Sequence, residues 1–213
     1  MTEPRRLSGG READILDLGD GTVLRQYRGT GHPEREGMVM EHARRRGYPV
    51  PRVVEIRENA LVLERIDGPT LARELLRRPW QARRYLRLLA SLHRQLHQIE
   101  APPELAAAGP GSTLIHLDFH PENVLMSPTG PVVIDWTNAR RGEPALDVAL
   151  TWVITATSGG PLGPLVVRPY LRWFDLAEVR RALPTAAARR IEDPNVTDRE
   201  RRAVRRLVER QAG

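Results

Sequence analysis

The stretch IHLDFHPENVLMSPTGPVVIDW, residues 115–136, decides the fold of this chain. It contains the pattern H-x-D-x-x-x-x-N, formed by His116, Asp118 and Asn123, and a further aspartate, Asp135, twelve residues after the asparagine. This spacing predicts one carboxylate that can take a proton from a hydroxyl, with an amide and a second carboxylate nearby.

Two short apolar runs around a turn explain how these groups would be held. Val124–Met126 and Val132–Ile134 are expected to be strands, and Ser127–Gly130 has the composition of a turn between them. Such a hairpin would fix the distance between Asn123 and Asp135. A surface loop that happens to hold the same residue types is the simpler alternative, but it does not explain four chemically coherent residues at these offsets.

The chemistry that suits this set is phosphoryl transfer, which requires positioning and charge neutralisation more than covalent catalysis. Asp118 would orient an attacking hydroxyl and accept its proton. Asn123 and Asp135 offer the hard oxygen ligands that Mg²⁺ prefers. The pattern therefore predicts a catalytic carboxylate and two metal ligands.

The form H-x-D-F-H-P-x-N-V-L, with His120 and Pro121, resembles the catalytic loop of the aminoglycoside phosphotransferase and choline-kinase-like family. This family is a branch of the protein-kinase-like fold, and the resemblance extends over about residues 7–155. It implies an enzyme that uses ATP and Mg²⁺ to phosphorylate a hydroxyl of a small molecule.

The resemblance implies an α+β, bilobal protein-kinase-like fold. A small β-rich N-lobe with one helix, which binds the nucleotide, would cover residues 1–63. A hinge would follow at 64–68, and a mainly helical C-lobe with the catalytic loop and acceptor site would occupy 69–213.

The same resemblance assigns nucleotide-binding residues in the expected N-lobe. Gly9 and Gly10 lie where the family has its loop over the ATP phosphates, although two glycines alone equally suit a plain turn. Arg25 stands where the family has a lysine that binds the α- and β-phosphates, and Glu36 matches the glutamate paired with that lysine. An arginine can bind phosphate through two hydrogen bonds, but it is planar and bulky. The alternative is that Arg25 is an exposed strand residue.

Residues at the hinge and around the loop complete the expected site. By position, the backbone carbonyl of Glu64 and the backbone N–H of Ile66 would bind adenine. His116 and Asp147 would support the catalytic loop, the latter from the start of a helix. Only eleven residues separate Asp135 from Asp147, which leaves no room for a long activation segment. A small-molecule acceptor is therefore expected rather than a protein.

His93 and His97 lie four residues apart in a segment with helical periodicity, a spacing that can hold zinc. The zinc-peptidase motif needs a glutamate after the first histidine, and Arg94 takes its place. Packing and hydrogen bonds between helix and loop explain the pair better.

Composition sets further limits. The 213 residues are 40% hydrophobic and include no cysteine, so disulfides and thiol chemistry are excluded. The amino-terminal residues have no apolar signal segment, and no run approaches the roughly 20 apolar residues of a membrane span. We therefore expect a cytoplasmic protein without a membrane partner. The pattern gives no expectation for the oligomeric state.

All 33 basic residues are arginines, and the net charge is +6. The arginines are dispersed among 27 acidic residues, and aromatic residues make up only 5%, so nucleic acid is not an expected partner. Two alternatives to an enzyme remain: a catalytically weak nucleotide-binding regulator, suggested by Arg25, and an arginine-rich nucleic-acid binder.

Overall fold

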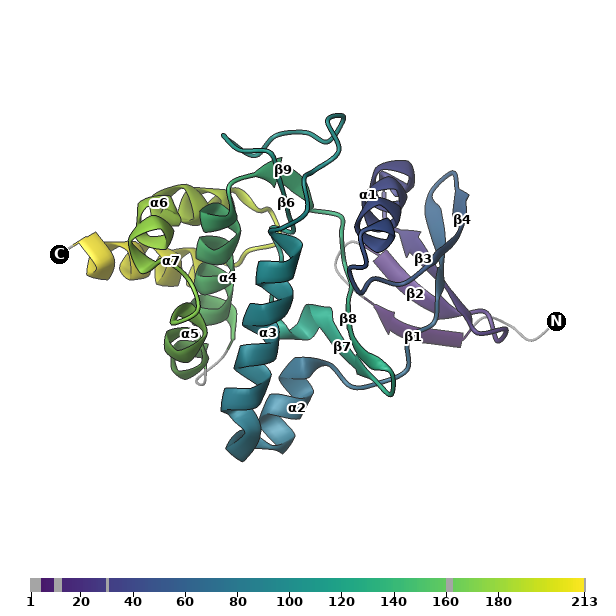
Figure 1. Ribbon diagram of the computed structural model, residues 1–213, viewed down its shortest axis with the longest axis horizontal. Coiled ribbons are helices and arrows are strands. Elements are labelled where there is room, and N and C mark those ends of the chain that lie inside the picture. Colours follow the sequence, from purple (N-terminus) through teal and green to yellow (C-terminus); the bar gives the residue numbers. More distant parts are fainter. Residues whose placement is uncertain (1–4, 10–12, 30, 160–162, 213) are drawn as a thin grey trace. The chain divides into compact units, whose positions relative to one another are not determined.

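The computed structural model describes residues 5–9, 13–29, 31–159 and 163–212 (Figure 1). In chain order the elements are β1 (Arg5–Gly9), β2 (Ala13–Asp17), β3 (Thr22–Tyr27), α1 (Pro33–Arg45), β4 (Val53–Arg57), β5 (Ala60–Glu64), α2 (Leu71–Arg77), η1 (Pro79–Gln81), α3 (Ala82–Leu96), β6 (Thr113–Ile115), η2 (Pro121–Asn123), β7 (Val124–Ser127), β8 (Gly130–Val133), β9 (Arg140–Gly142), α4 (Pro144–Ser158), α5 (Gly163–Leu171), α6 (Leu176–Glu192) and α7 (Asp198–Ala212).

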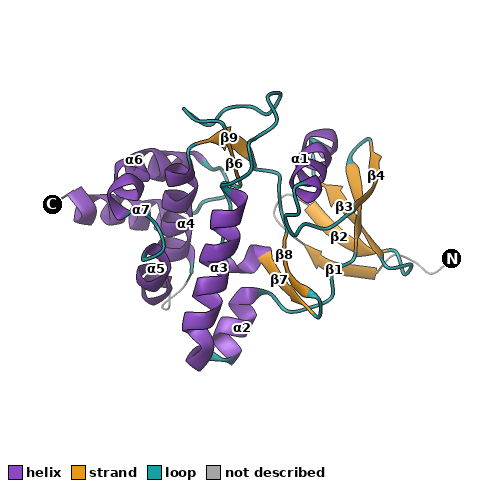
Figure 2. Cartoon of the chain, viewed as in Figure 1, coloured by secondary structure: helices purple, strands orange, loops and turns teal. Residues whose placement is uncertain are grey.

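The chain divides into two units, and the division is discontinuous in sequence. The first unit comprises Met1–Pro69 and Leu125–Thr137, and the second comprises Thr70–Val124 and Asn138–Gly213. Figure 2 shows that α1 is the helix among the strands of the first unit, whereas helices predominate in the second. This is the predicted α+β composition. The lobe boundaries at residues 63 and 69 stay a prediction.

The first unit contains a five-stranded antiparallel sheet with the order β1-β2-β3-β5-β4. Strands β2 and β3 form a hairpin, with Gly19 and Gly21 both at positive φ in its turn. That conformation favours glycine. Strands β1 and β4 were not predicted, because β1 is arginine-rich and β4 follows a segment interrupted by proline.

Helix α1 contacts β4 and β5 of this sheet. It begins at Pro33, as a proline in the first turn permits, and its C-terminal end is followed by Gly47 at φ 77°. A Cβ added at Gly37 would lie 3.0 Å from the Cδ1 of Ile56, so glycine allows close approach of the helix to the strands. Val39 and Met40 are almost fully buried, and these contacts form the core of the unit.

The hairpin β7–β8 belongs to the first unit through backbone hydrogen bonds to distant residues. The N–H of Met126 donates to the carbonyl of Pro69 at 2.8 Å, and the N–H of Val133 donates to the carbonyl of Pro49 at 2.8 Å. Gly68 has φ 152°, and a Cβ there would lie 2.2 Å from the carbonyl oxygen of Met126. Glycine is therefore required where the two backbones meet.

The second unit is built around α4, whose residues 146–155 are all buried. Helices α5, α6 and α7 contact α4, and α3 contacts α5. The segment of helical periodicity that holds His93 is confirmed as helix α3, which ends at Leu96, one residue before His97. A capping box precedes α7: the N–H of Glu200 donates to the Thr197 hydroxyl, and the N–H of Thr197 donates to the Glu200 carboxylate.

Among the described residues, no helix combines the length and the apolar character that a membrane span requires.

Candidate functional site

Strand β3 carries Arg25 on its inward face. Val23, Arg25 and Tyr27 alternate with less buried residues, and Arg25 is only 8% exposed. The alternative of an exposed strand residue is therefore wrong. Alternation along a strand sends every second side chain to the same face, so β3 brings a guanidinium into a largely apolar interior. A charge in this position needs partners.

Three groups of the first unit surround the Arg25 guanidinium. Its Nη2 donates to Oδ1 of Asp135 at 2.6 Å and to the hydroxyl of Thr137 at 2.9 Å. Its Nε lies 3.4 Å from Oε1 of Glu36, an ion pair whose geometry falls short of a hydrogen bond. Burial lowers the pKa of Arg25, but the carboxylates of Asp135 and Glu36 outweigh burial and raise it above its usual value. Arg25 is thus a permanent cation between two carboxylates.

Glu36 lies in the first turn of α1 and is 2% exposed. Its carboxylate accepts hydrogen bonds from the hydroxyl of Tyr27, from the hydroxyl of Thr137 at 2.8 Å and from the N–H of Trp136 at 3.2 Å. Burial and the adjacent Glu36 raise the pKa of the Tyr27 phenol, so this group stays a neutral donor. Three donors besides Arg25 therefore compensate the buried charge of Glu36.

Asp135 follows β8 in a left-handed conformation, with φ 66°. A non-glycine residue rarely adopts this conformation, and the surrounding contacts must hold it there. The adjacent Trp136 is 1% exposed, packs edge-on against Tyr48 at 5.7 Å and donates from its indole to the carbonyl of Val133 at 3.0 Å. About one third of the Asp135 side chain is exposed. It can therefore offer an oxygen to a cation from solvent.

The remaining nucleotide-binding predictions concern glycines and the hinge. Gly9 is the last residue of β1 and pairs with Asp14, whereas Gly10 lies outside the described residues. Glu64 ends β5, and Ile66 follows in an irregular segment. Of the described residues, none accepts a hydrogen bond from the N–H of Ile66. The adenine-binding role of Glu64 and Ile66 stays a prediction.

In the second unit, Asp118 and Asn123 lie against each other. The Nδ2 of Asn123 donates to the backbone carbonyl of Asp118 at 2.9 Å and to its Oδ2 at 3.0 Å. Because Nδ2 makes these contacts, Oδ1 is the atom that Asn123 can offer to a cation. Nε2 of His120 lies 3.3 Å from Oδ1 of Asp118. The carboxylate of Asp118 is therefore oriented by an amide and an imidazole.

The surroundings of Asp118 favour its ionised form. Burial raises its pKa, but the hydrogen bond from His120 and the charges of His120, His116 and Arg190 hold the pKa below its usual value. Leu117, directly before it, has φ 61°, the second non-glycine residue with positive φ among the described residues. Of these two left-handed residues, Leu117 directly precedes Asp118, and Asp135 is itself a predicted site residue.

Asp147, near the start of α4, is fully buried and accepts two backbone hydrogen bonds from the loop. The N–H of His116 donates to Oδ2 at 2.8 Å, and the N–H of Leu117 donates to Oδ1 at 2.8 Å. These bonds fix the loop one and two residues before Asp118. Its nearby histidines hold the pKa of Asp147 well below its usual value despite burial.

His93 on α3 and His97, directly after the end of that helix, also contact Asp147. Nε2 of His97 lies 3.1 Å from Oδ2 of Asp147, and Nε2 of His93 lies 2.9 Å from the same atom, although poorly aligned for a hydrogen bond. The ring of His93 stacks on Phe119 at 4.2 Å, and its Nδ1 contacts the hydroxyl of Tyr170. Burial lowers the pKa of His93 to about 4, so the ring is neutral near pH 7.

The ligating atoms of His93, His97 and Asp147 lie within 4.8 Å of one another, close enough to hold a metal. The carboxylate, however, already accepts two backbone hydrogen bonds. The polar partners of His93 and His97 are Tyr170 on α5 and Asp147 on α4, so the predicted packing is confirmed but the hydrogen bonds join helices rather than a helix and a loop. The sequence did not predict the contact of His97 with Asp147, because 50 residues separate the two.

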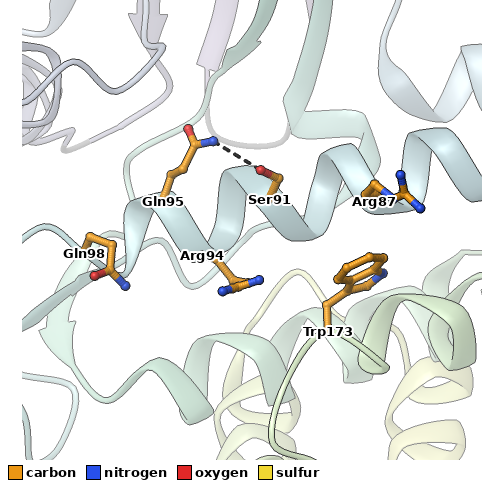
Figure 3. Close-up of a pocket in the computed structure, with 6 residues that line it drawn as sticks. All are labelled: Arg87, Ser91, Arg94, Gln95, Gln98 and Trp173. Carbon is orange, nitrogen blue, oxygen red and sulfur yellow. Dashed lines mark hydrogen bonds between the residues drawn. The ribbon is translucent and has the colours of Figure 1, made fainter.

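A separate groove of about 540 Å³ lies along the exposed side of α3 (Figure 3). Its lining residues are Arg87, Ser91, Arg94, Gln95, Gln98 and Trp173. Arg87 lies over the indole of Trp173, with 5.4 Å from its Cζ to the ring centroid. None of the predicted site residues lines this groove, so it is distinct from the Asp118 loop.

Family models match the chain over most of both units. The phosphotransferase enzyme family (APH) matches residues 101–188, and the RIO domain matches residues 25–144. The first match continues well beyond residue 155, where the resemblance of the sequence was expected to fade. A search of curated proteins finds no match.

Solved structures show the same fold over the whole chain. A choline/ethanolamine kinase family protein from Mesorhizobium loti is 17% identical with a TM-score of 0.68, covering 100% of this chain and 87% of that chain. A thermostable mutant of aminoglycoside phosphotransferase APH(4)-Ia, in complex with AMP-PNP and hygromycin B, is 18% identical with a TM-score of 0.72, covering 100% and 94%. Ethanolamine kinase from Plasmodium vivax is 12% identical with a TM-score of 0.66, covering 97% and 81%.

These structures have the protein-kinase-like fold, and the RIO model alone spans more than half of the chain. The chain therefore has the kinase-like phosphotransferase fold and belongs to the RIO-domain family, and over residues 101–188 it is similar to the phosphotransferase enzyme family (APH).

Proposed function

We propose that this protein transfers the γ-phosphoryl group of ATP to a hydroxyl of a small molecule, with Mg²⁺. The observation that carries the proposal is the pair Asp118–Asn123, held together by two hydrogen bonds from one amide. The loop before Asp118 is fixed by two further bonds to buried Asp147. This gives a carboxylate in a defined position, which phosphoryl transfer requires.

Asp118 is the proposed catalytic residue. Since its pKa is below the usual range, the carboxylate is ionised near pH 7 and can accept a hydrogen bond from the acceptor hydroxyl. A bond forms between that oxygen and the γ-phosphorus, the bond from phosphorus to the leaving oxygen of ADP breaks, and the proton passes to Asp118. A carboxylate of low pKa is a weak base, so we expect it to orient the hydroxyl first and take the proton late.

The first unit is proposed to bind the nucleotide. Arg25 would contact phosphate through its guanidinium, Glu36 would orient Arg25, and Gly9 and Gly10 would lie over the phosphates. The backbone of Glu64 and Ile66 would bind adenine.

Asp135 and the Oδ1 of Asn123 are the proposed ligands of Mg²⁺, and their hard oxygen atoms fit this ion. The metal would neutralise phosphate charge. Within the second unit, His116 and Asp147 are proposed to support the loop that carries Asp118 and Asn123.

The acceptor is proposed to be a hydroxylated small molecule that is not a polycation. From Glu143 to Gly213 the chain has twelve arginines against nine acidic residues, whereas a polycationic antibiotic would require a carboxylate-lined site. Binding of hygromycin B is a property of the APH(4)-Ia complex, and we do not extend it to this protein.

A second candidate is a nucleotide-binding regulator with weak catalysis. The observation that favours it is the contact of Arg25 with Asp135 at 2.6 Å, because the same side chain must then serve phosphate as well.

The test is a screen of hydroxylated metabolites and antibiotics, in which ADP release with Mg²⁺ and ATP is measured. Turnover that depends on one acceptor and is lost in Asp118→Asn supports the enzyme. Tight ATP binding with no turnover on any acceptor supports the regulator instead. Salt-sensitive retention on DNA or RNA, with no ATP affinity, would overturn both.

A further inference from the structure

We infer that Arg25 and a divalent cation compete for the carboxylate of Asp135, so that the free protein binds the cation weakly at Asp135 and binds it well only when a phosphate draws Arg25 away. This inference rests on the metal-binding role of Asp135 in the proposed function. It concerns the residue at which the chain departs from its family, where arginine stands in place of lysine.

The side chains of Arg25 and Asp135 are in direct contact. Nη2 of Arg25 lies 2.6 Å from Oδ1 of Asp135, a short charge-assisted hydrogen bond. The hydroxyl of Thr137 lies 3.4 Å from the same oxygen. A cation at this carboxylate would have to displace Arg25 from Oδ1 or lie next to a fixed positive charge. Both lower its affinity.

The shape of the arginine side chain allows it to meet two carboxylates at once. The Nε of Arg25 faces Glu36 while its Nη2 faces Asp135, so the two carboxylates are met by different atoms of one planar group. A lysine has a single nitrogen, which cannot present separate donors along two edges. The contact with the two carboxylates through two different nitrogens is therefore a consequence of arginine at this position.

The guanidinium of Arg25 can break its contact with Asp135 and still stay beside Glu36. Glu36 keeps three other hydrogen-bond donors, and it still attracts the guanidinium through Nε. Asp135 is about one third exposed, whereas Glu36 is buried, so Asp135 is the partner that solvent can replace. A phosphate oxygen would draw Nη2 away by the same charge-assisted bonding.

The test measures binding of Mn²⁺, as a probe for Mg²⁺, to the full chain without nucleotide. Electron paramagnetic resonance of free Mn²⁺ reports bound metal without any reference to turnover. Arg25→Gln removes the charge, and the three remaining donors of Glu36 support folding, which circular dichroism checks. Arg28→Gln is the matched control, because Arg28 is exposed and pairs with Asp14.

We expect Arg25→Gln to tighten Mn²⁺ binding about ten-fold or more, as removal of a charge a few ångströms from the metal predicts. Arg28→Gln should leave the affinity unchanged. Adding Asp135→Asn to Arg25→Gln should abolish the gain. If Arg25→Gln does not fold, Arg25→Lys replaces it, with a smaller gain expected because one charge stays.

Equal Mn²⁺ affinity of the wild type and a folded Arg25 variant would overturn the inference. It would leave the proposed function intact, because ADP release by the wild type is measured separately. If neither protein binds Mn²⁺ and the double variant is no different, the inference is wrong, and the metal role of Asp135 then depends on Mn²⁺ binding in the presence of nucleotide. A gain that survives Asp135→Asn would place the metal elsewhere and also overturn the inference.

Discussion

The two units compensate their buried carboxylates with different kinds of donor. Glu36 in the first unit is held mainly by side chains, and it shares Arg25 with the partly exposed Asp135. Asp147 in the second unit is fully buried and held by two backbone N–H groups and two imidazoles. Side-chain partners can exchange when a ligand arrives, whereas backbone partners move only if the loop moves. We infer that the first unit adapts to ligand and the second is fixed beforehand.

The largest effect is expected from Asp147→Ala. Removing this carboxylate leaves the N–H groups of His116 and Leu117 without their acceptor in a buried place, so we expect a loss of about 3–5 kcal/mol in the free energy of unfolding. Urea unfolding checks this value. Glu143→Ala, an exposed carboxylate four residues earlier, is the control and should change stability by less than about 0.5 kcal/mol. An unchanged urea-unfolding midpoint in Asp147→Ala would contradict the inference that the second unit is fixed before ligand binds.

Asp118→Asn separates positioning from chemistry in the same loop. The shape is kept but the proton acceptor is lost, so turnover should fall about 10²-fold or more while nucleotide affinity changes little. Steady-state kinetics and nucleotide titration measure the two quantities. Glu122→Gln is the matched control, because Glu122 accepts a hydrogen bond from Thr70 at 2.8 Å and has no proposed role in transfer. Near-normal turnover in Asp118→Asn would contradict the assignment of the base.

The pH dependence of stability tests how firmly His93 is buried beside Asp147. Its pKa is about 4 in the folded protein against about 6.5 in the unfolded chain, so the unfolded state takes up the proton first as the pH falls. The stability is therefore fully present above pH 6.5 and is lost as the pH falls from 6.5 towards 4. Between pH 7 and pH 5 we expect a loss of about 1–2 kcal/mol from this group.

Urea unfolding at the two pH values measures this loss in the wild type and in His93→Gln, where it should be absent. His32→Gln, at an exposed histidine, should keep the wild-type loss. Equal pH dependence in the wild type and His93→Gln would show that folding does not lower the pKa of His93.

The smallest effect is the coupling between Arg25 and Glu36. Their atoms lie 3.4 Å apart, but each residue also has other partners, so a double-mutant cycle on kcat/KM for ATP should give a coupling of about 1 kcal/mol. Arg25→Lys should be better tolerated than Arg25→Ala, because it keeps a charge. The exposed pair Arg28 and Asp14 is the control cycle, with no expected effect on kcat/KM. Strictly additive changes at Arg25 and Glu36 would mean that the pair does not act together on phosphate.

Much of the fold could be predicted, because its signals are local. The hairpin of β2 and β3 follows from Gly19 and Gly21, and α3 follows from leucines at helical spacing. Strand β1 could not be predicted, because its residues RRLSG have no alternation of apolar and polar side chains. Only its pairing with β2 identifies it as a strand.

The site was predictable where a motif defines it and not where its partners are distant in sequence. Asp118 and Asn123 lie five residues apart, so their hydrogen bond follows from a short loop. The contacts of Arg25 with Asp135 span 110 residues, and those of His97 with Asp147 span 50. No periodicity or spacing records such contacts, since they depend on the packing of whole elements.

The discontinuity of the first unit has a consequence for synthesis on the ribosome. Residues 126–137 supply the hydrogen-bond donors for the carbonyls of Pro49 and Pro69 and for the carboxylate of Glu36. These acceptors are synthesised well before their donors. A nascent chain that ends at Pro69 contains the five strands and α1 but leaves Glu36 without Trp136 and Thr137. The amino-terminal unit therefore completes its folding only after about two thirds of the chain has been made, and a fragment cut at Pro69 is a poor candidate for independent expression.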